Sequence, residues 1–200
     1  MIRFAGACGL LVALSALPSG AQVIEFESNG LKFQTLTKSG VTVMFASLPT
    51  RLRSYAIVQA AVSNGSAGPY TIRPEDFTFI RADGTSLRAA AAGSVVQMLS
   101  VKGGSSDVIK LVNAYEASLY GIPKMRSTNG YEQRRQAALL FGSNKFRAAA
   151  LASAVALVQT KLVAGQSTDG AVFFPTDGKP LGPGRVVVRT NTDVFQFNPE

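Results

Sequence analysis

The stretch Tyr55-Ala-Ile-Val-Gln-Ala-Ala-Val-Ser-Asn-Gly-Ser66 determines how the rest of the chain is interpreted. Its first eight residues, 55–62, form a nearly continuous apolar run, which is typical of a central strand that is covered on both faces. The run ends abruptly in a set of turn-forming residues that extends to Pro69. We therefore expect a buried strand followed by a tight change of direction.

Shorter strand patterns lie on both sides of this run. They alternate apolar and polar side chains, and glycine-containing turns separate them. Four or five closely spaced strands of this kind favour an antiparallel sandwich over a βαβ fold. The predicted elements are a hairpin over 31–48 that turns at Lys38-Ser39-Gly40, a strand at 70–72, a strand at 77–81 and a hairpin turn at Asp83-Gly84.

The apolar period changes to that of a helix in the middle of the chain. We expect one helix to begin at Ser105, Ser106 or Asp107 and to stop at Gly121, two residues before Pro123. A second helix is predicted over 131–141. Residues 89–104, rich in Ala, Gly and Ser, are interpreted as a connector without an assigned structure.

A third predicted helix runs from Asn144 to Ala164 and ends at Gly165. It is apolar nearly all round, so we expect it to be buried or to contact a partner. Its strongly apolar part is too short to span a bilayer. The residues at helical spacing are Ala148, Leu151, Val155, Val158 and Leu162.

Strand patterns return at the end of the chain, over 171–174, 185–189 and 194–197. These strands need hydrogen-bonding partners, and the free edges of the N-terminal sheet are the obvious ones. The helices are therefore predicted to be an insertion within one sandwich. The predicted parts are a signal peptide at 1–21, the N-terminal strands at 22–104, the helical insertion at 105–165 and the closing strands at 166–200.

The signal peptide is predicted from the first residues. Arg3 provides the positive start, an apolar stretch follows over 4–17, and Ser19-Gly20-Ala21 offers small residues for cleavage before Gln22. An uncleaved anchor is the alternative, but the stretch is short for a membrane span. We expect an exported protein, periplasmic or extracellular.

The only cysteine, Cys8, lies inside this predicted leader. A lipidated cysteine normally follows the apolar stretch, whereas most of the stretch comes after Cys8, so we do not expect a lipoprotein. The mature chain then has no cysteine, which excludes disulfides and thiolate metal sites from it.

The strand blocks resemble the immunoglobulin-like, telokin-like domains of exported bacterial proteins. The resemblance rests on the patterns of 55–66 and 72–84, and on Gly170-Ala-Val-Phe-Phe-Pro175 and 186–197. It covers about half of the mature chain. It implies an antiparallel β-sandwich and a role in binding or stabilisation without catalysis. Together with the helical patterns, this predicts a mainly β fold: an immunoglobulin-like antiparallel β-sandwich with two or three inserted helices. The helical part, 105–165, departs from the family pattern.

Histidine is absent from the chain, which excludes a Ser-His-Asp triad and an HExxH zinc site. A Ser-Lys dyad, a carboxylate pair or a calcium site is left. Ser143-Asn144-Lys145 is better explained as a helix cap, and Glu75-Asp76 as solvated carboxylates at a corner. We assign no catalytic residue, no metal ligand and no cofactor.

One cluster of charge exceeds the background. Six cations lie within 24 residues, against the single acid Glu132, in a chain of net charge +8. They form either a solvated face or a basic patch that contacts anionic lipid, an anionic polymer or an acidic envelope protein. We expect no nucleic acid partner for an exported chain. The cations are Lys124, Arg126, Arg134, Arg135, Lys145 and Arg147.

These observations predict an exported, non-enzymatic binding or assembly protein of the cell envelope. Two alternatives stay open. One is an envelope hydrolase with a Ser-Lys or carboxylate mechanism. The other is a subunit of a larger secretion or adhesion complex that docks through the helix over 144–164.

Overall fold

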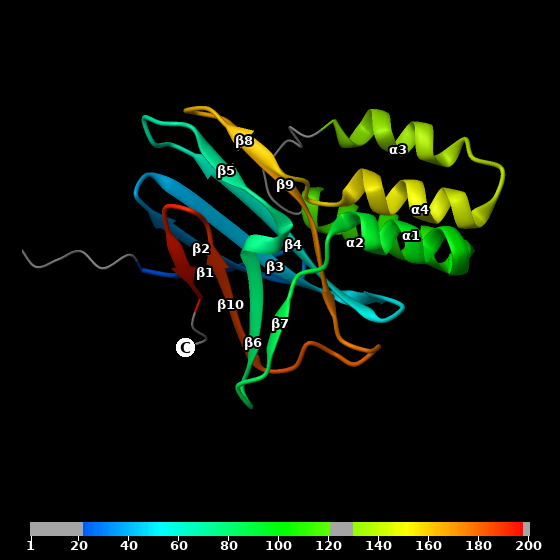
Figure 1. The fold of residues 1–200 in the computed structure, drawn as a ribbon, viewed down its shortest axis with the longest axis horizontal. Helices are drawn as coiled ribbons and strands as arrows, with labels where there is room; N and C mark the ends of the chain where they lie inside the picture. The colour runs from blue at the N-terminus through cyan, green and yellow to red at the C-terminus, as the bar shows by residue number, and fades with distance from the viewer. Residues whose placement is uncertain (1–21, 121–129, 198–200) are drawn as a thin grey trace, which may run out of the picture.

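The computed structural model describes residues 22–120 and 130–197, and this part of the chain folds into three layers (Figure 1). A five-stranded sheet lies in the middle, a four-stranded sheet covers one of its faces, and four helices cover the other. The prediction of a mainly β chain with antiparallel sheets and helices is confirmed. The predicted signal peptide, 1–21, lies outside the described residues.

The middle sheet has the order β1-β2-β3-β4-β9, and every neighbouring pair is antiparallel. The predicted hairpin is β2–β3, and its turn residues Ser39 and Gly40 have φ values of 51° and 78°. Strand β1 has no counterpart among the predicted elements. The strands are β1 (Ile24–Ser28), β2 (Leu31–Lys38), β3 (Val41–Leu52), β4 (Tyr55–Asn64) and β9 (Ser167–Pro175).

The second sheet has the order β11-β10-β6-β7 and is also antiparallel. A separate ribbon of two strands is formed by β5 (Tyr70–Ile72) and β8 (Thr160–Leu162). A 3-10 turn at Pro74–Asp76 provides the predicted corner before β6. The strands of the second sheet are β6 (Phe77–Arg81), β7 (Ser86–Arg88), β10 (Gly184–Arg189) and β11 (Val194–Gln196).

Strands from the two ends of the chain pair with each other in both sheets. Ile57 of β4 pairs with Phe173 of β9, and Phe79 of β6 pairs with Val186 of β10. The two sheets also contact each other, and the ring centroids of Phe79 and Phe174 lie 6.2 Å apart at their interface. The segments that precede and follow the helices therefore share the same two sheets.

Strand β4 contributes to two separate apolar cores. Ile57 faces the helices, whereas the next residue, Val58, faces the second sheet. Both are buried, as the continuous apolar run of 55–62 predicted for a strand covered on both faces. The alternation of side chains along one strand thus divides the interior into a sheet–sheet core and a helix–sheet core.

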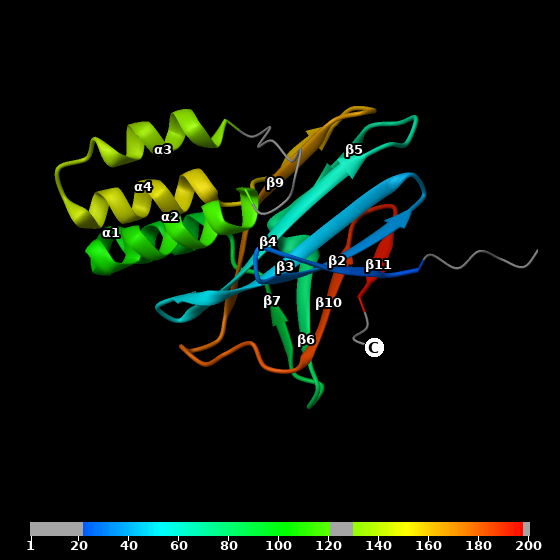
Figure 2. The same ribbon diagram turned by 180° about the vertical axis from the view of Figure 1, so that it is seen from behind.

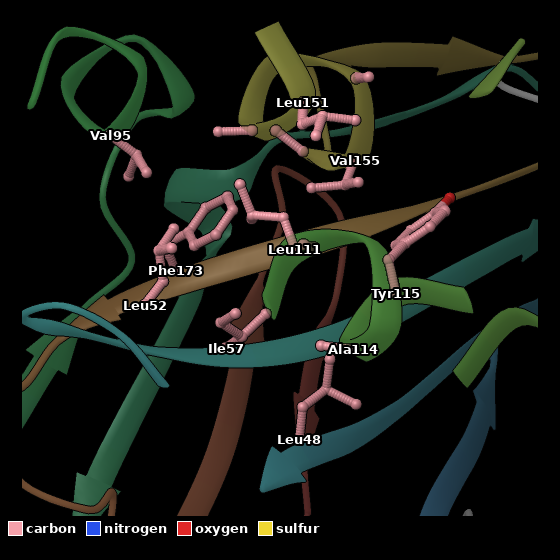
Figure 3. Packing of buried hydrophobic residues seen from close by; sticks show 14 of the residues in the cluster. Leu48, Leu52, Ile57, Val95, Leu111, Ala114, Tyr115, Leu151, Val155 and Phe173 are labelled. Atoms are coloured by element: carbon pink, nitrogen blue, oxygen red, sulfur yellow. The ribbon is translucent and has the colours of Figure 1, made fainter. Parts of the chain in front are cut away.

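The helices lie together on the outer face of the middle sheet (Figure 2). Leu111 of α2 and Leu151 and Val155 of α4 point down onto Ile57 and Phe173 of the sheet, as Figure 3 shows. The helices are α1 (Ala92–Lys102), α2 (Ser105–Tyr120), α3 (Tyr131–Leu139) and α4 (Asn144–Val155). The predicted helix over 105–120 and the predicted start of the third helix at Asn144 agree with α2 and α4. The predicted stop at Gly121-Pro123 lies outside the described residues.

The interpretation of 89–104 as a connector is wrong, because α1 occupies 92–102. The described ranges therefore contain four helices instead of the two or three expected. Helix α1 lacks the usual signals: its N-cap is Ala91, without a side-chain hydrogen bond, and Gly93 lies in its first turn. It is held by tertiary packing, since Val95 and Leu99, four residues apart, are both fully buried.

The third helix is shorter than predicted and ends at Val155 instead of Gly165. Beyond it the chain pairs with β9: Leu157 N–H donates to the carbonyl of Ala171 at 2.9 Å. Gly170 allows this close approach, because a Cβ atom there would lie 2.4 Å from Leu157 N. Sheet pairing therefore overrides helical periodicity, and Leu162 lies in β8 instead of a helix. The expected burial of this helix is confirmed, for example at Ala148, Leu151 and Ala152.

The chain enters and leaves the helical layer at the outer edge of β9. Ala90 N–H donates to the carbonyl of Phe173 at 2.8 Å, just before α1, and Ala156 forms a parallel bridge with Ala171 just after α4. The helical segment is thus attached at both of its ends to the same strand. None of the helices in the described ranges is long and apolar enough to cross a membrane.

Candidate functional site

The six predicted cations do not form one patch among the described residues. Lys124 and Arg126 lie outside them. Arg134 and Arg135 lie on α3, whereas Lys145 and Arg147 lie at the start of α4. The four described cations therefore form two pairs on different helices, one on α3 and one at the start of α4.

The two arginines of α3 contact the neighbouring helices. The guanidinium of Arg135 lies 2.6 Å from a carboxylate oxygen of Glu116 on α2, and Arg134 donates to the carbonyl of Ala154 on α4 at 2.8 Å. Glu116 also accepts a hydrogen bond from the hydroxyl of Tyr131 at 3.2 Å. These contacts hold α3 against α2 and α4, which is a structural role for both arginines.

Tyr131 is fully buried beside these charges. Burial raises the pKa of its hydroxyl well above the usual value, and the negative charge of Glu116 raises the pKa further. Its ring lies 4.4 Å from the ring of Tyr115, whose hydroxyl donates to the carboxylate of Asp169. Tyr115, Tyr131 and Asp169 are thus buried polar residues, whereas the pair Arg135–Glu116 beside them is partly exposed.

Gln59 of β4 is also a buried polar residue and is only 4% exposed. Neither atom of its amide group has a hydrogen-bond partner among the residues that the structure describes. A buried amide without partners is costly, because its hydrogen bonds to water are lost on folding.

Arg147 organises the loop between α3 and α4. Its guanidinium donates to the carbonyl of Phe141 at 2.8 Å and to Asn144 Oδ1 at 3.2 Å. The predicted cap is present in position only: Ser143 is the N-cap of α4, and its carbonyl accepts the N–H of Arg147, but its side chain makes no capping hydrogen bond. Lys145 is exposed in the first turn of α4.

This loop exposes large apolar side chains. Leu140 is 86% exposed, Phe141 48% and Phe146 57%. Sequence reasoning placed Leu140 and Phe141 in the second helix, which in fact ends at Leu139. The available signal was the pair Leu-Phe directly before Gly142, where no further turn of helix could bury both side chains.

The end of α1 packs against α4, the helix that follows this loop. A Cβ atom on Gly103, the residue after α1, would lie 3.1 Å from the Cβ of Ala148 in α4. Both views show the α1–α2 junction and the α3–α4 loop at the same outer end of the helical layer (Figures 1 and 2). The α1–α2 junction also contacts the β3–β4 turn, where Arg53 pairs with Asp107. We call this end the helical tip and define it by six exposed residues: Val101, Lys102, Leu140, Phe141, Lys145 and Phe146.

The charges around the helical tip are positive. The sequence contains no acidic residue between Asp83 and Asp107 or between Glu132 and Asp169. Asp107 itself is 2% exposed and lies 2.7 Å from the guanidinium of Arg53. The tip therefore combines exposed apolar side chains with two exposed lysines, Lys102 and Lys145.

A second surface feature is a cleft of about 810 Å³ beside β2, β3 and the 180–184 loop. Apolar side chains such as Phe45, Phe79 and Leu181 line it. Three of its polar side chains are already engaged, since Gln34 donates to Glu25 and Arg51 donates to the carbonyl of Gly178. Its polar lining is thus partly occupied by contacts within the chain.

No group of three or more Asp, Glu, Cys or His side chains within 22–120 and 130–197 is placed to hold a metal ion. Comparison with known proteins finds no match to a protein-family model, to a curated protein or to a solved structure. The helical tip and the cleft are therefore the surfaces on which a function can be argued from this chain alone.

Proposed function

We propose that this chain is an exported, non-enzymatic binding or assembly protein of the cell envelope, and that the helical tip is its contact surface. The observation that carries the proposal is the exposure of Leu140, Phe141 and Phe146 at one outer end of the molecule. Export rests on the leader pattern of residues 1–21.

Most large apolar side chains in the described part of the chain are buried, although Ile24, Ile109, Val158 and Val163 are exposed as well. Large apolar residues of the sheets and helices fill two buried cores, and burial of one such side chain contributes roughly 1.5–3 kcal/mol. At the tip this stabilisation is not realised. Clustered apolar exposure on a globular protein is typical of an interaction site.

We further propose that the two sheets form an immunoglobulin-like sandwich that presents the helices. Two antiparallel sheets packed face to face support this assignment, as does the pairing of N-terminal and C-terminal strands in each of them. In this arrangement the sandwich is the support and the helical layer is the binding element.

The second alternative is a subunit that docks to a larger assembly through the helix over 144–164. The apolar face of this helix is not available for docking. The apolar side chains of α4 are buried within the molecule, including Ala148, Leu151 and Val155. Docking through this part of the chain would have to use the exposed start of α4, which belongs to the helical tip.

Deletion of the helices is a poor test, because α2 and α4 cover Ile57 and Phe173 of the middle sheet. Point changes at the tip avoid this problem. The triple variant Leu140→Ser, Phe141→Ser and Phe146→Ser alters exposed side chains only.

The measurement is co-sedimentation of the purified protein with isolated bacterial cell envelopes. We expect the unaltered protein to sediment with the envelopes and the triple serine variant to stay in the supernatant. A matched control changes Val158→Ser and Val163→Ser, which are exposed apolar residues beyond α4, and should sediment normally. Equal sedimentation of the triple variant and the unaltered protein would refute binding through the tip.

A further inference from the structure

We propose that the helical tip docks on an anionic phospholipid surface, with its apolar side chains in the lipid interface and its lysines at the headgroups. This inference rests on the proposed function and names the partner of the same surface. Three properties of the tip support it: its shape, its charge and its internal order.

The shape of the tip fits a lipid surface better than a protein partner. A specific protein interface typically needs about 800 Å² and 20–30 residues on each side. The tip is the outer end of the helical layer (Figure 1). It exposes few large apolar side chains, chiefly Leu140, Phe141 and Phe146. A lipid interface accepts such side chains without a complementary surface.

The charge of the tip matches an anionic surface. Lys102 and Lys145 are both exposed beside the apolar side chains, and the nearest acid on α2, Asp107, is buried against Arg53. A lysine near an anionic membrane increases partitioning by about fivefold. The two lysines and the apolar side chains therefore both favour binding to an anionic membrane.

The loop that carries Leu140 and Phe141 is held in place before binding. Arg147 donates to the carbonyl of Phe141 at 2.8 Å, and its own N–H donates to the carbonyl of Ser143 at 2.8 Å. Pre-ordering lowers the entropic cost of placing these side chains at an interface.

The absence of tryptophan from the chain makes a direct test possible. Phe141→Trp introduces a single fluorescent reporter at the tip. With vesicles of phosphatidylcholine and phosphatidylglycerol, we expect its emission to shift to the blue and to be quenched by brominated acyl chains. Vesicles of phosphatidylcholine alone should produce little change. The control reporter is Val163→Trp, which lies after β8 and should not respond.

Charge is tested in the Phe141→Trp background. Lys102→Glu with Lys145→Glu should weaken binding to the phosphatidylglycerol vesicles by at least about tenfold. Lys161→Glu with Lys179→Glu makes the same change in net charge on the sheet side of the molecule, at two exposed lysines, and should have a much smaller effect. Equal losses in the two pairs would show that only net charge matters and would overturn docking at the tip.

The remaining outcomes also decide the question. A blue shift that appears without vesicles and grows with protein concentration would mean that two copies of the chain associate through the tip. No response to phosphatidylglycerol vesicles would overturn the lipid inference. The proposed function would still stand in that case if the triple serine variant failed to sediment with envelopes, and a protein partner would then be indicated. Retention of envelope binding by the triple serine variant would instead reject the proposed function itself.

Discussion

Asp107, at the start of α2, accepts two hydrogen bonds from the guanidinium of Arg53, which lies in the β3–β4 turn. Nη2 and Nε of Arg53 lie 2.7 Å and 3.0 Å from the same carboxylate oxygen. That oxygen also accepts the N–H of Gly104 at 2.9 Å. One carboxylate thus joins a turn of the middle sheet to the beginning of a helix 54 residues away.

The first prediction concerns this pair. Asp107→Asn should lower the free energy of unfolding by about 2 kcal/mol, because a hydrogen-bonded and nearly buried charge is lost at a helix N-terminus. Arg53 is 37% exposed, so solvent screens the pair and the coupling itself should be only about 1 kcal/mol. Urea denaturation of Arg53→Gln, Asp107→Asn and the double variant gives the coupling directly. Strict additivity would show that the two side chains do not interact.

The second prediction concerns Gly170. An alanine there would place Cβ 2.4 Å from Leu157 N and 2.5 Å from Leu157 Cα, both of which are backbone atoms in a paired segment. Gly170→Ala should destabilise the protein by at least about 2 kcal/mol, because the bridge to β9 has to open. The matched control is Gly93→Ala in α1, where nothing lies within 4 Å. That change should stabilise the protein by about 0.5–1 kcal/mol. Thermal unfolding followed by circular dichroism measures both.

The third prediction concerns the buried amide of Gln59. Gln59→Met keeps a similar volume and removes two polar atoms that have no hydrogen-bond partner among the described residues. We expect the free energy of unfolding to rise by about 1 kcal/mol, because the desolvation penalty of the amide disappears. Gln59→Glu is the contrasting variant and should destabilise the protein by burying a charge. Destabilisation by methionine would reveal that the amide has a partner in the native protein.

The fourth prediction concerns alkaline pH. Burial raises the pKa of Tyr131 in the folded protein, whereas in the unfolded chain it titrates near 10. Above about pH 10 the unfolded chain loses this proton and the folded protein keeps it, so stability should fall as the pH rises. Burial also raises the pKa of Tyr70, so both groups contribute.

Tyr131→Phe should therefore reduce, but not abolish, the loss of stability between about pH 9 and 11. Urea midpoints measured across this range test the prediction. An unchanged pH dependence in the variant would show that Tyr131 ionises in the folded protein as it does in the unfolded chain.

The sequence predicted most of the sheet framework, because its strands carry strong local patterns. The apolar run of β4 and the turn at Ser39-Gly40 needed no tertiary information to recognise. The exposed strand β1 was missed although its signals are local: Ile24 and Phe26 alternate with glutamates, and Asn29-Gly30 turns the chain into β2 with φ values of 51° and 73°. The end of α4 was missed because pairing of Leu157 with Ala171 is a long-range contact that periodicity does not encode.

The candidate site was harder to predict than the fold. The cluster of cations was visible in the sequence, but the partners of Arg134 and Arg135 on the neighbouring helices were not. The exposed tip was missed for a different reason: the predicted second helix was extended to Phe141, although Gly142 follows directly, whereas α3 ends at Leu139 and leaves Leu140 and Phe141 exposed.

The attachment of the helical segment at Ala90 and Ala156 has a consequence for association between molecules. An unpaired edge strand can form backbone hydrogen bonds with a strand of another chain, and repeated pairing of this kind leads to aggregation. On β9 the hydrogen-bonding positions at Ala171 and Phe173 are already taken by the chain itself, on the way into and out of the helices. The chain segments that lead into and out of the helices thus protect this edge of the sheet from pairing with a strand of another molecule.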